Sequence, residues 1–470
     1  MQGPDREGAA VILSDTRIFI DFGSTFTKVV AFDLAGETLL ARVQAPSTVD
    51  TDVNLGLDAA LGKLRETVPV AESDIRAALA CSSAAGGLRM VCIGLVPEYT
   101  TEAGRLAALG AGAKVVGSYS YELTRSELRE LEALRPDIVL LTGGTDGGNK
   151  RTILHNAEVL ASSQTVRNII AAGNKSAGDE LKEIFSGSGQ NVVFAPNVMP
   201  EFGRLDIEPV NADIRELFIS RITEAKGVDR ARARIGEIVM PTPSAVLAGA
   251  KALADGTYRE AGLGPLMVVD VGGATTDVYS VAEGVPQKAG VSYVGLPEPY
   301  AKRSVEGDLG MFHNLDTLMA LARDAHLEFQ EGADRAQILQ GLKDVLGVPK
   351  GEAQTRDQLL LSRLAVKTAV ERHVGRLEHR YTLNGDVWVQ KGKDLTELQT
   401  VLGAGGPLAF SADPRFVLAG AAGAEDASIL KPKAPKYLLD EKYILFAVGL
   451  LSLSEPEKAI RIFKKYVKVL

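Results

Sequence analysis

The chain has 470 residues, of which 46% are hydrophobic and 24% are charged. These are ordinary values for a globular protein, and the length suits about two to four domains. The formal net charge of −8 disfavours binding along a nucleic-acid backbone, which requires a basic surface. Two cysteines, Cys81 and Cys92, are too few for a disulfide framework or a zinc site. We therefore expect a reducing, cytoplasmic setting.

Neither end of the chain predicts membrane insertion. Residues 1–16 carry charges and lack the apolar core of a signal peptide, so we expect an N-terminal extension there. The apolar run at 444–453 is about half as long as a membrane span. It predicts a buried helix.

The elements in chain order predict an α/β protein. Residues 17–33 are two β-rich runs around a small-residue turn, which is a hairpin signal. Strand patterns at 137–142, 167–171 and 191–195 alternate with helical patterns such as 176–186. Such alternation is typical of a largely parallel sheet.

A second cycle begins with a helix from Pro241, whose first turn contains proline. Strands at 266–271 and 277–282 then enclose another glycine-rich turn, about 250 positions after the first. This repetition predicts a remote internal duplication. Residues 301–380 are charged and poor in glycine, which predicts a helical insertion, and 431–437 has the composition of a linker before two final helices.

The first chemical motif is DFGSTFTK, residues 21–28. A tight turn of glycine and hydroxyl residues points backbone N–H groups into one concavity, where phosphate oxygens bind. Asp21 ends a strand and could hold Mg²⁺ through water. The phosphate-binding candidates are Gly23, Ser24, Thr25, Thr27 and Lys28. Taken alone, the motif is equally explained as a hairpin with a polar turn.

The second motif, DVGGATTD at 270–277, has the same order of apolar strand, aspartate, glycines, hydroxyls and returning strand. Two facing hairpins would enclose a phosphate chain that one hairpin leaves open, so the pair favours a nucleotide clamp. The candidates are the metal-binding Asp270 and Asp277, together with Gly272, Gly273, Thr275 and Thr276. Asp21 completes the predicted metal set, and Asp21 and Asp277 are candidate catalytic residues.

The third motif is VLGAGGPLAF at 401–410, where a strand runs into Gly403, Gly405 and Gly406. An adenosine could lie against such a turn, although many strand–helix turns look similar.

In this order the three motifs resemble the phosphate-1, phosphate-2 and adenosine motifs of the actin/Hsp70-like (ASKHA) superfamily. The resemblance implies an α/β fold with two lobes, duplicated ribonuclease H-like cores, a helical insertion at 301–380, and ATP or ADP with Mg²⁺. It divides the chain into lobe I at 17–240, lobe II at 241–430, and a linker with C-terminal helices at 431–470.

Two helices resemble the superfamily's connecting helices, one from Pro241 and one within 441–453. Their small residues would let the backbones cross closely at a hinge. In the chaperone branch a glutamate precedes the Pro-Thr pair, whereas Met240 stands here. One metal-shell carboxylate is therefore unaccounted for, and the spacing of Glu237 does not match.

Over about residues 17–460, the chain resembles the glutamate mutase accessory family called MutL or GlmL, which is unrelated to the mismatch-repair protein of the same name. The stretches GGTDGGN at 143–149 and VEGDLGM at 305–311 indicate this branch. The resemblance implies a reactivating, chaperone-like factor that uses ATP to maintain an adenosylcobalamin-dependent mutase or aminomutase. It implies no nucleic-acid or membrane partner.

The loop that contains Asp146 follows the end of a predicted parallel strand, which is the usual place for ligand loops. Asp146 is a catalytic candidate that could orient water or a metal, and a capped glycine turn explains it equally well. Glu306 and Asp308 could serve the metal or a partner, or simply mark a junction between a loop and a helix.

Three functions remain open. A slow ATPase that remodels a partner enzyme is favoured, and its partner contacts would lie on 301–380 unless that region only caps the adenine pocket. A small-molecule kinase would need a base aimed at a substrate hydroxyl, for which Asp146 is the only fair candidate. A nucleotide-controlled assembly protein would need a self-complementary surface.

Overall fold

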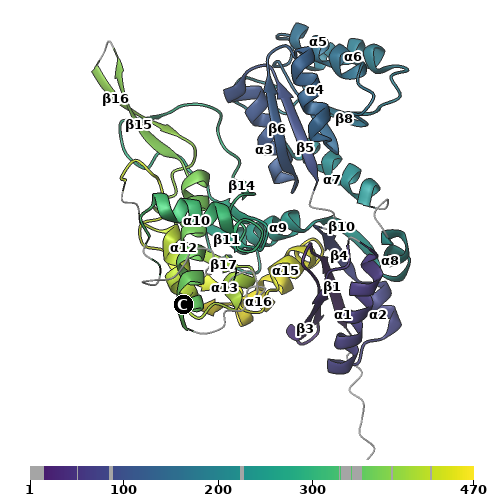
Figure 1. Cartoon of the computed structure of the whole chain (residues 1–470), viewed down its shortest axis with the longest axis vertical. Coiled ribbons are helices and arrows are strands. Elements are labelled where there is room, and N and C mark those ends of the chain that lie inside the picture. Colours follow the sequence, from purple (N-terminus) through teal and green to yellow (C-terminus); the bar gives the residue numbers. More distant parts are fainter. Residues whose placement is uncertain are drawn as a thin grey trace, which may run out of the picture.

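A computed structural model of the chain describes residues 15–49, 51–83, 88–222, 227–327, 329, 340, 352–382, 385–423 and 426–470. The expectation for residues 1–16 therefore lies almost wholly outside the described residues. Three sheet-centred bodies surround a middle layer formed by two helices, α9 (Thr242–Asp255) and α15 (Leu445–Ser452) (Figure 1). A short additional sheet projects from one of them.

The first body is a five-stranded sheet at the start of lobe I. Its strand order is β10-β4-β1-β2-β3. β1 to β3 pair antiparallel, whereas β4 and β10 extend the sheet with parallel pairing. The bounds are β1 Thr16–Phe22, β2 Phe26–Asp33, β3 Thr38–Pro46, β4 Leu79–Ser82 and β10 Glu237–Pro241, with helices α1 Val53–Thr67, α2 Glu72–Arg76 and α8 Val228–Arg234. The hairpin predicted at 17–33 is confirmed.

The second body, the parallel unit, is a separate sheet within lobe I that the sequence did not set apart. Its order is β6-β5-β7-β8-β9 and every pair is parallel. The strands are β5 Arg89–Gly94, β6 Lys114–Ser120, β7 Ile138–Leu141, β8 Asn168–Ala171 and β9 Asn191–Phe194. The helices are a π-helix at Pro97–Thr101, α3 Glu102–Gly110, α4 Arg125–Leu134, α5 Arg151–Ala161, a 3₁₀ turn at Lys175–Ala177, α6 Gly178–Phe185 and α7 Glu208–Ile222.

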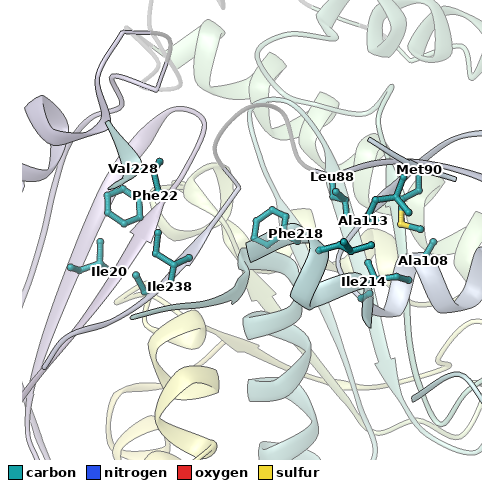
Figure 2. Packing of buried hydrophobic residues seen from close by; sticks show 14 of the residues in the cluster. Ile20, Phe22, Leu88, Met90, Ala108, Ala113, Ile214, Phe218, Val228 and Ile238 are labelled. Atoms are coloured by element: carbon teal, nitrogen blue, oxygen red, sulfur yellow. The ribbon is translucent and has the colours of Figure 1, made fainter. Parts of the chain in front are cut away.

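One continuous hydrophobic cluster joins these two bodies. Figure 2 shows Phe218 of α7 between the side chains of the first body and those of the parallel unit, with Ile214 of the same helix among the latter. On the two sides lie Ile20, Phe22, Val228 and Ile238, and Leu88, Met90, Ala108 and Ala113. Each fully buried large side chain contributes about 1.5–3 kcal/mol. α7 therefore holds the parallel unit to the first sheet by apolar packing.

The third body is the sheet of lobe II, with the order β14-β12-β11-β17-β18-β19. Its first five strands repeat the order of the first sheet, since β11, β12 and β14 pair antiparallel and β17 and β18 add in parallel. The bounds are β11 Leu266–Val271, β12 Thr276–Val281, β14 Ala301–Glu306, β17 Thr400–Ala404, β18 Lys436–Leu439 and β19 Lys468–Val469. The duplication predicted from the two hairpins is thus visible in the topology.

Two stretches differ from the sequence prediction. The segment 301–380 is helical only in part, because β14 opens it and β15 begins before it ends. Its described helices, α10 Leu315–Asp324 and α12 Glu352–His373, pack into the core of lobe II. The predicted linker at 431–437 runs into the interior strand β18, because a sheet position outweighs local proline and lysine content.

The remaining elements complete the fold. α13 Gly406–Ala409, α14 Pro414–Leu418 and a 3₁₀ turn at Ala419–Ala421 follow β17, and α16 Pro456–Tyr466 follows α15. A small sheet of β13 Val291–Tyr293, β16 Gly385–Lys391 and β15 Arg376–Thr382 projects from lobe II as a hairpin (Figure 1). Among the described residues, no helix has both the length and the hydrophobicity needed to cross a membrane.

The two middle helices cross at closely apposed glycines. A Cβ on Gly449 of α15 would overlap the carbonyl oxygen of Ala245 on α9, and a Cβ on Gly249 would lie 2.8 Å from the Leu445 carbonyl oxygen. Only glycine permits this approach. The crossing predicted from the small residues of the two connecting helices is confirmed.

Candidate functional site

The carboxylate of the first hairpin is buried and fully partnered. Asp21 at the end of β1 and Lys28 on β2 are register partners, and Lys28 Nζ donates to Asp21 Oδ2 at 2.8 Å. Thr242 Oγ1, at the start of α9, donates to Asp21 Oδ1 at 2.6 Å. Although burial opposes it, the Asp21 charge raises the pKa of Lys28 above its ordinary value. Asp21 therefore connects the hairpin to the first connecting helix.

The turn of this hairpin exposes the groups expected to bind phosphate. Ser24 and Thr25 are exposed, and the Gly23 N–H donates to the Phe26 carbonyl at 3.1 Å. A Cβ on Gly23 would stand 2.6 Å from that oxygen, so the turn requires glycine. Thr27 is buried on the face of β2 that meets α1, because neighbouring strand residues point to opposite faces. The structure does not bring Thr27 to the Asp21–Lys28 face.

The second hairpin carries two carboxylates in one register pair, Asp270 on β11 and Asp277 on β12. Asp277 is buried and accepts from Arg303 Nε at 3.0 Å and Nη2 at 2.7 Å. Thr275 Oγ1 and the Tyr279 hydroxyl also donate to it, at 3.0 and 3.2 Å. In contrast, no donor among the described residues lies within hydrogen-bonding distance of the Asp270 carboxylate.

The turn of the second hairpin packs against the segment that follows β14. The carbonyl oxygens of Gly272 and Gly273 accept from the N–H groups of residues 311–313 at 2.9–3.0 Å. Thr276 is fully buried, and its hydroxyl donates to the Leu309 carbonyl at 2.7 Å. Gly272, Gly273 and Thr275 remain partly exposed. Gly272, Gly273 and Thr275 are therefore accessible to a ligand, whereas the buried Thr276 stabilises the packing of the turn.

The adenosine candidates divide in a similar way. Gly403 lies in β17, where a Cβ would meet Leu418 Cδ1 at 2.7 Å, so it serves helix packing. Gly405 has φ of +94°, and a Cβ there would overlap the Val271 carbonyl and stand 2.6 Å from Asp270 Oδ1. Gly406 faces open space at the start of α13. The glycine turn of the third motif thus lies directly beside the Asp270 carboxylate.

Asp21 and Asp270 meet at one small cavity of about 20 Å³, large enough for a single water molecule. A third carboxylate, Asp440, lines it after β18, and so does Tyr443. The remaining lining comes from Thr242, Val246, Ala404, Leu445 and Phe446. The hairpins predicted to face each other across a cleft therefore do so at the helix crossing.

Asp440 and Tyr443 are site residues that the sequence interpretation missed. Asp440 accepts the N–H groups of Ile444 and Leu445, at 2.9 and 2.8 Å, where α15 begins. The Tyr443 ring lies 4.4 Å from Lys28 Nζ, and its backbone has φ of +56°, unusual for a bulky residue. A signal existed, because YLLD at 437–440 repeats the pattern of an apolar strand ending in aspartate.

The concentration of carboxylates perturbs their protonation. Burial and the neighbouring charge of Asp277 raise the pKa of Asp270 to about 7. Burial raises the pKa of Asp440 to about 6, although the two backbone N–H groups oppose the shift. Burial also raises the pKa of Cys81, whose sulfur lies 3.8 Å from Asp21 Oδ1, so this thiol stays protonated. The site therefore attracts a cation most strongly above about pH 7.

Three other carboxylates from the sequence interpretation lie outside this cavity. Asp146 accepts from Lys175 N and Asn197 Nδ2, both at 3.0 Å, in the loop after β7. Glu306 and Asp308 are both bound by Arg372 Nη1, at 2.7 and 2.8 Å. Met240 is buried in the apolar core, and Glu237 is exposed at the start of β10. Neither of these last two supplies a carboxylate to the cavity.

A molecule of two lobes with matching sheets, one carboxylate-bearing hairpin on each and two helices crossing beneath them, has the actin-like ATPase fold. This is the fold class that the sequence motifs predicted. The chain belongs to the MutL family, because the family model described as MutL protein matches residues 17–467. The "Protein MutL" of Clostridium tetanomorphum is 44% identical over 458 residues, which are 96% of this chain and 99% of that protein.

The solved structures that match the chain are much more distant in sequence. Nucleotide-free acetone carboxylase aligns with 93% of this chain and 70% of its own, with 13% identity and a TM-score of 0.41. The 2-hydroxyisocaproyl-CoA dehydratase activator of Clostridium difficile, with bound ADPNP, covers 96% of this chain and 97% of its own, with 9% identity and a TM-score of 0.32.

Proposed function

We propose that the chain binds ATP or ADP with Mg²⁺ between its two hairpins and hydrolyses ATP slowly. The observation that carries this proposal is the meeting of Asp21 and Asp270 at one cavity. Strands that lie far apart in the sequence bring these two carboxylates together, and each follows the same apolar strand pattern. Local folding of a single hairpin would not require that convergence.

The two hairpins and the glycine turn at Gly405 would contact different parts of the nucleotide. The N–H groups of Gly23 and Gly272 donate to the Phe26 and Thr275 carbonyls and so shape the two turns. The exposed Ser24 and Thr25 would bind phosphate oxygens from the first hairpin, and Gly273 and Thr275 would do so from lobe II. Gly405 and Gly406 would lie under the adenosine. Lys28 would compensate phosphate charge from its place beside Asp21.

The cavity suits a hard cation, because the side chains that line it offer carboxylate and hydroxyl oxygens and neither sulfur nor imidazole. Asp270 is the prime candidate to hold Mg²⁺, since no donor in the described chain compensates its charge. Asp21 and Asp440 line the same cavity, and Asp277 lies opposite Asp270. No three such side chains in the described ranges already stand at metal-binding spacing, so water would complete the shell. When bound, Mg²⁺ would neutralise charge on the phosphates.

We further propose that the energy of ATP serves to maintain or reactivate an adenosylcobalamin-dependent mutase or aminomutase. Membership of the MutL family supports this role. We propose that lobe I spans 17–240 and that lobe II spans 241–430, with strands β18 and β19 of the segment 431–470 completing the sheet of lobe II. A small-molecule kinase remains the second candidate, although Lys175 and Asn197 hold the Asp146 carboxylate and Asp146 does not line the cavity between Asp21 and Asp270.

The test measures Mg-ATP binding by calorimetry and phosphate release in the absence of any added small molecule. We expect binding and slow turnover in the native chain, and tenfold or greater loss in Asp270→Asn, as is typical for metal-site carboxylates. Asp386→Asn, on the projecting hairpin, is the matched control. Absence of binding in the native chain contradicts the proposal, and turnover that requires an added hydroxyl compound and Asp146 supports the kinase instead.

A further inference from the structure

The C-terminal end of α3 is held by two side chains from outside the parallel unit. One is Arg303, on β14 of lobe II, and the other is Ser244, in the first turn of α9. Each is linked to one of the two phosphate hairpins. The end of α3 is therefore a place where side chains connected to both hairpins contact the parallel unit.

Arg303 connects the second hairpin to α3 through one buried guanidinium. Its Nε and Nη2 donate to Asp277 Oδ2, while Nη1 donates to the Ala113 carbonyl at 2.9 Å and to the Leu109 carbonyl at 3.3 Å. Its side chain is only 4% exposed. The Leu109 carbonyl lies in the last turn of α3, at the negative end of the helix dipole, where a cation is favourable, and the Ala113 carbonyl lies in the connection to β6. Arg303 thus divides its donors between a hairpin carboxylate and the helix end.

Ser244 makes the corresponding connection from the first hairpin. Its hydroxyl donates to the Ala111 carbonyl at 2.8 Å. Two residues earlier in the same helical turn, Thr242 donates to Asp21 at 2.6 Å. The fit at this point is close, since a Cβ on Gly112 would stand 2.7 Å from Ser244 Oγ and 2.9 Å from Pro241 Cβ. Movement of α9 relative to α3 would therefore break this contact.

α3 is well placed to pass such a change on. It packs against β5, β6 and β7 of the parallel unit and against α7, and the buried side chains of its inner face belong to the cluster shared by both bodies. On its other side it packs against β14. A change at its C-terminal end consequently acts on the whole parallel unit.

We propose that Arg303, together with Ser244, transmits the state of the phosphate hairpins through α3 to the parallel unit. The proposal rests on the proposed function, because Mg-ATP is the ligand that would alter the surroundings of Asp277. When the Asp277 carboxylate gains a cationic neighbour, Arg303 binds it less strongly. The hydrogen bonds from Arg303 to the Leu109 and Ala113 carbonyls then change as well. Mg-ATP shifts the position of the parallel unit only to the extent that it binds the two arrangements differently.

The experiment is amide hydrogen exchange on the full chain, with and without Mg-ATP, while nucleotide affinity is measured separately by calorimetry. In the native chain we expect exchange at residues 105–113 to change by about fivefold or more, the lower end of usual allosteric coupling. Arg303→Lys keeps a charge beside Asp277, but a compact ammonium cannot reach both partners. In this variant nucleotide still binds and the change at 105–113 disappears.

Two further variants make the outcome decisive. Ser244→Ala removes one hydroxyl without any charge, so it folds, and it should reduce the change at 105–113 while leaving affinity intact. Arg372→Lys is the matched control, because Arg372 bridges Glu306 and Asp308 within lobe II, and it should behave as the native chain. A full native response in both Arg303→Lys and Ser244→Ala overturns the inference. Nucleotide binding in the native chain without any change at 105–113 also overturns it but leaves the proposed function standing, whereas absence of binding removes both.

Discussion

Replacing Asp270 by asparagine should stabilise the nucleotide-free protein at alkaline pH and not at acidic pH. The carboxylate lies among Asp21, Asp277 and Asp440, and its pKa is raised to about 7 by burial and by the charge of Asp277. Asparagine has nearly the same shape and carries no charge at any pH. The variant therefore removes the repulsion and keeps the packing.

The magnitude follows from linkage. The pKa of an unfolded aspartate is about 3.9, so folding raises it by about 3 units, equivalent to at most about 4 kcal/mol. Because the folded-state pKa is the higher one, ionisation of Asp270 destabilises the folded protein. The native chain therefore keeps its full free energy of unfolding below about pH 4 and loses part of it as the pH rises to about 7. The advantage of Asp270→Asn in free energy of unfolding should grow over this window and then level off. Partial access of water to Asp270 will reduce it, and about 2 kcal/mol is a reasonable expectation.

The assay is urea unfolding of the metal-free protein, with EDTA present, at pH 5 and at pH 8. Asp206→Asn, at an exposed aspartate whose carboxylate has no partner among the described residues, is the control and should show no such pH dependence. An equal effect of Asp270→Asn at both pH values would refute the electrostatic reasoning. So would a variant that is less stable than the native chain at pH 8.

Four further substitutions, of which Gly62→Ala is a control, test the packing around the site. Asp277→Ala should lower the free energy of unfolding by about 3–5 kcal/mol, measured by urea unfolding, because it leaves the buried Arg303 charge without its carboxylate. A native-like midpoint would contradict this reasoning. Gly449→Ala should lower the thermal midpoint by several degrees, because the new Cβ would overlap the Ala245 carbonyl. In the control, Gly62→Ala, the new Cβ enters open space on α1, so the free energy of unfolding should rise by up to about 1 kcal/mol. Gly405→Ala should weaken ATP binding, measured by calorimetry, because its φ is positive and its Cβ would crowd Asp270; unchanged affinity would exclude this turn from the site.

The sequence predicted the parts of the site in which chemistry and local geometry share one short stretch. The turn at Gly23 and the strand ends at Asp21 and Asp270 carry their own signals, since glycine, hydroxyl and carboxylate must stand at fixed spacing around a hairpin. The helix crossing was predicted in a different way, from the resemblance of two distant helices to the superfamily's connecting helices, in which Gly249 and Gly449 permit close approach.

The parts that the sequence did not reveal depend on tertiary partners. Nothing local marks Arg303 as the partner of Asp277, because the contact exists only once β14 pairs with β12. Thr27 and Thr276 lie in the right motifs, but strand alternation and the Leu309 contact turn their hydroxyls away from the cleft. The strand at 436–439 was hidden because its composition resembles a linker, whereas the neighbouring strand β17 decides its structure.

The two hairpins share a sheet order but differ in the origin of the cation that compensates their carboxylates. Asp21 is paired with Lys28, its register partner on the same hairpin, so that ion pair is complete within lobe I. Asp277 is paired with Arg303, which comes from the next strand and also binds the end of α3 in the parallel unit. Under the proposed function, a ligand that displaces Lys28 would act on α3 only indirectly, through Asp21, Thr242 and Ser244. A ligand that weakens the Arg303 pair would act on the end of α3 directly, because one guanidinium makes both contacts.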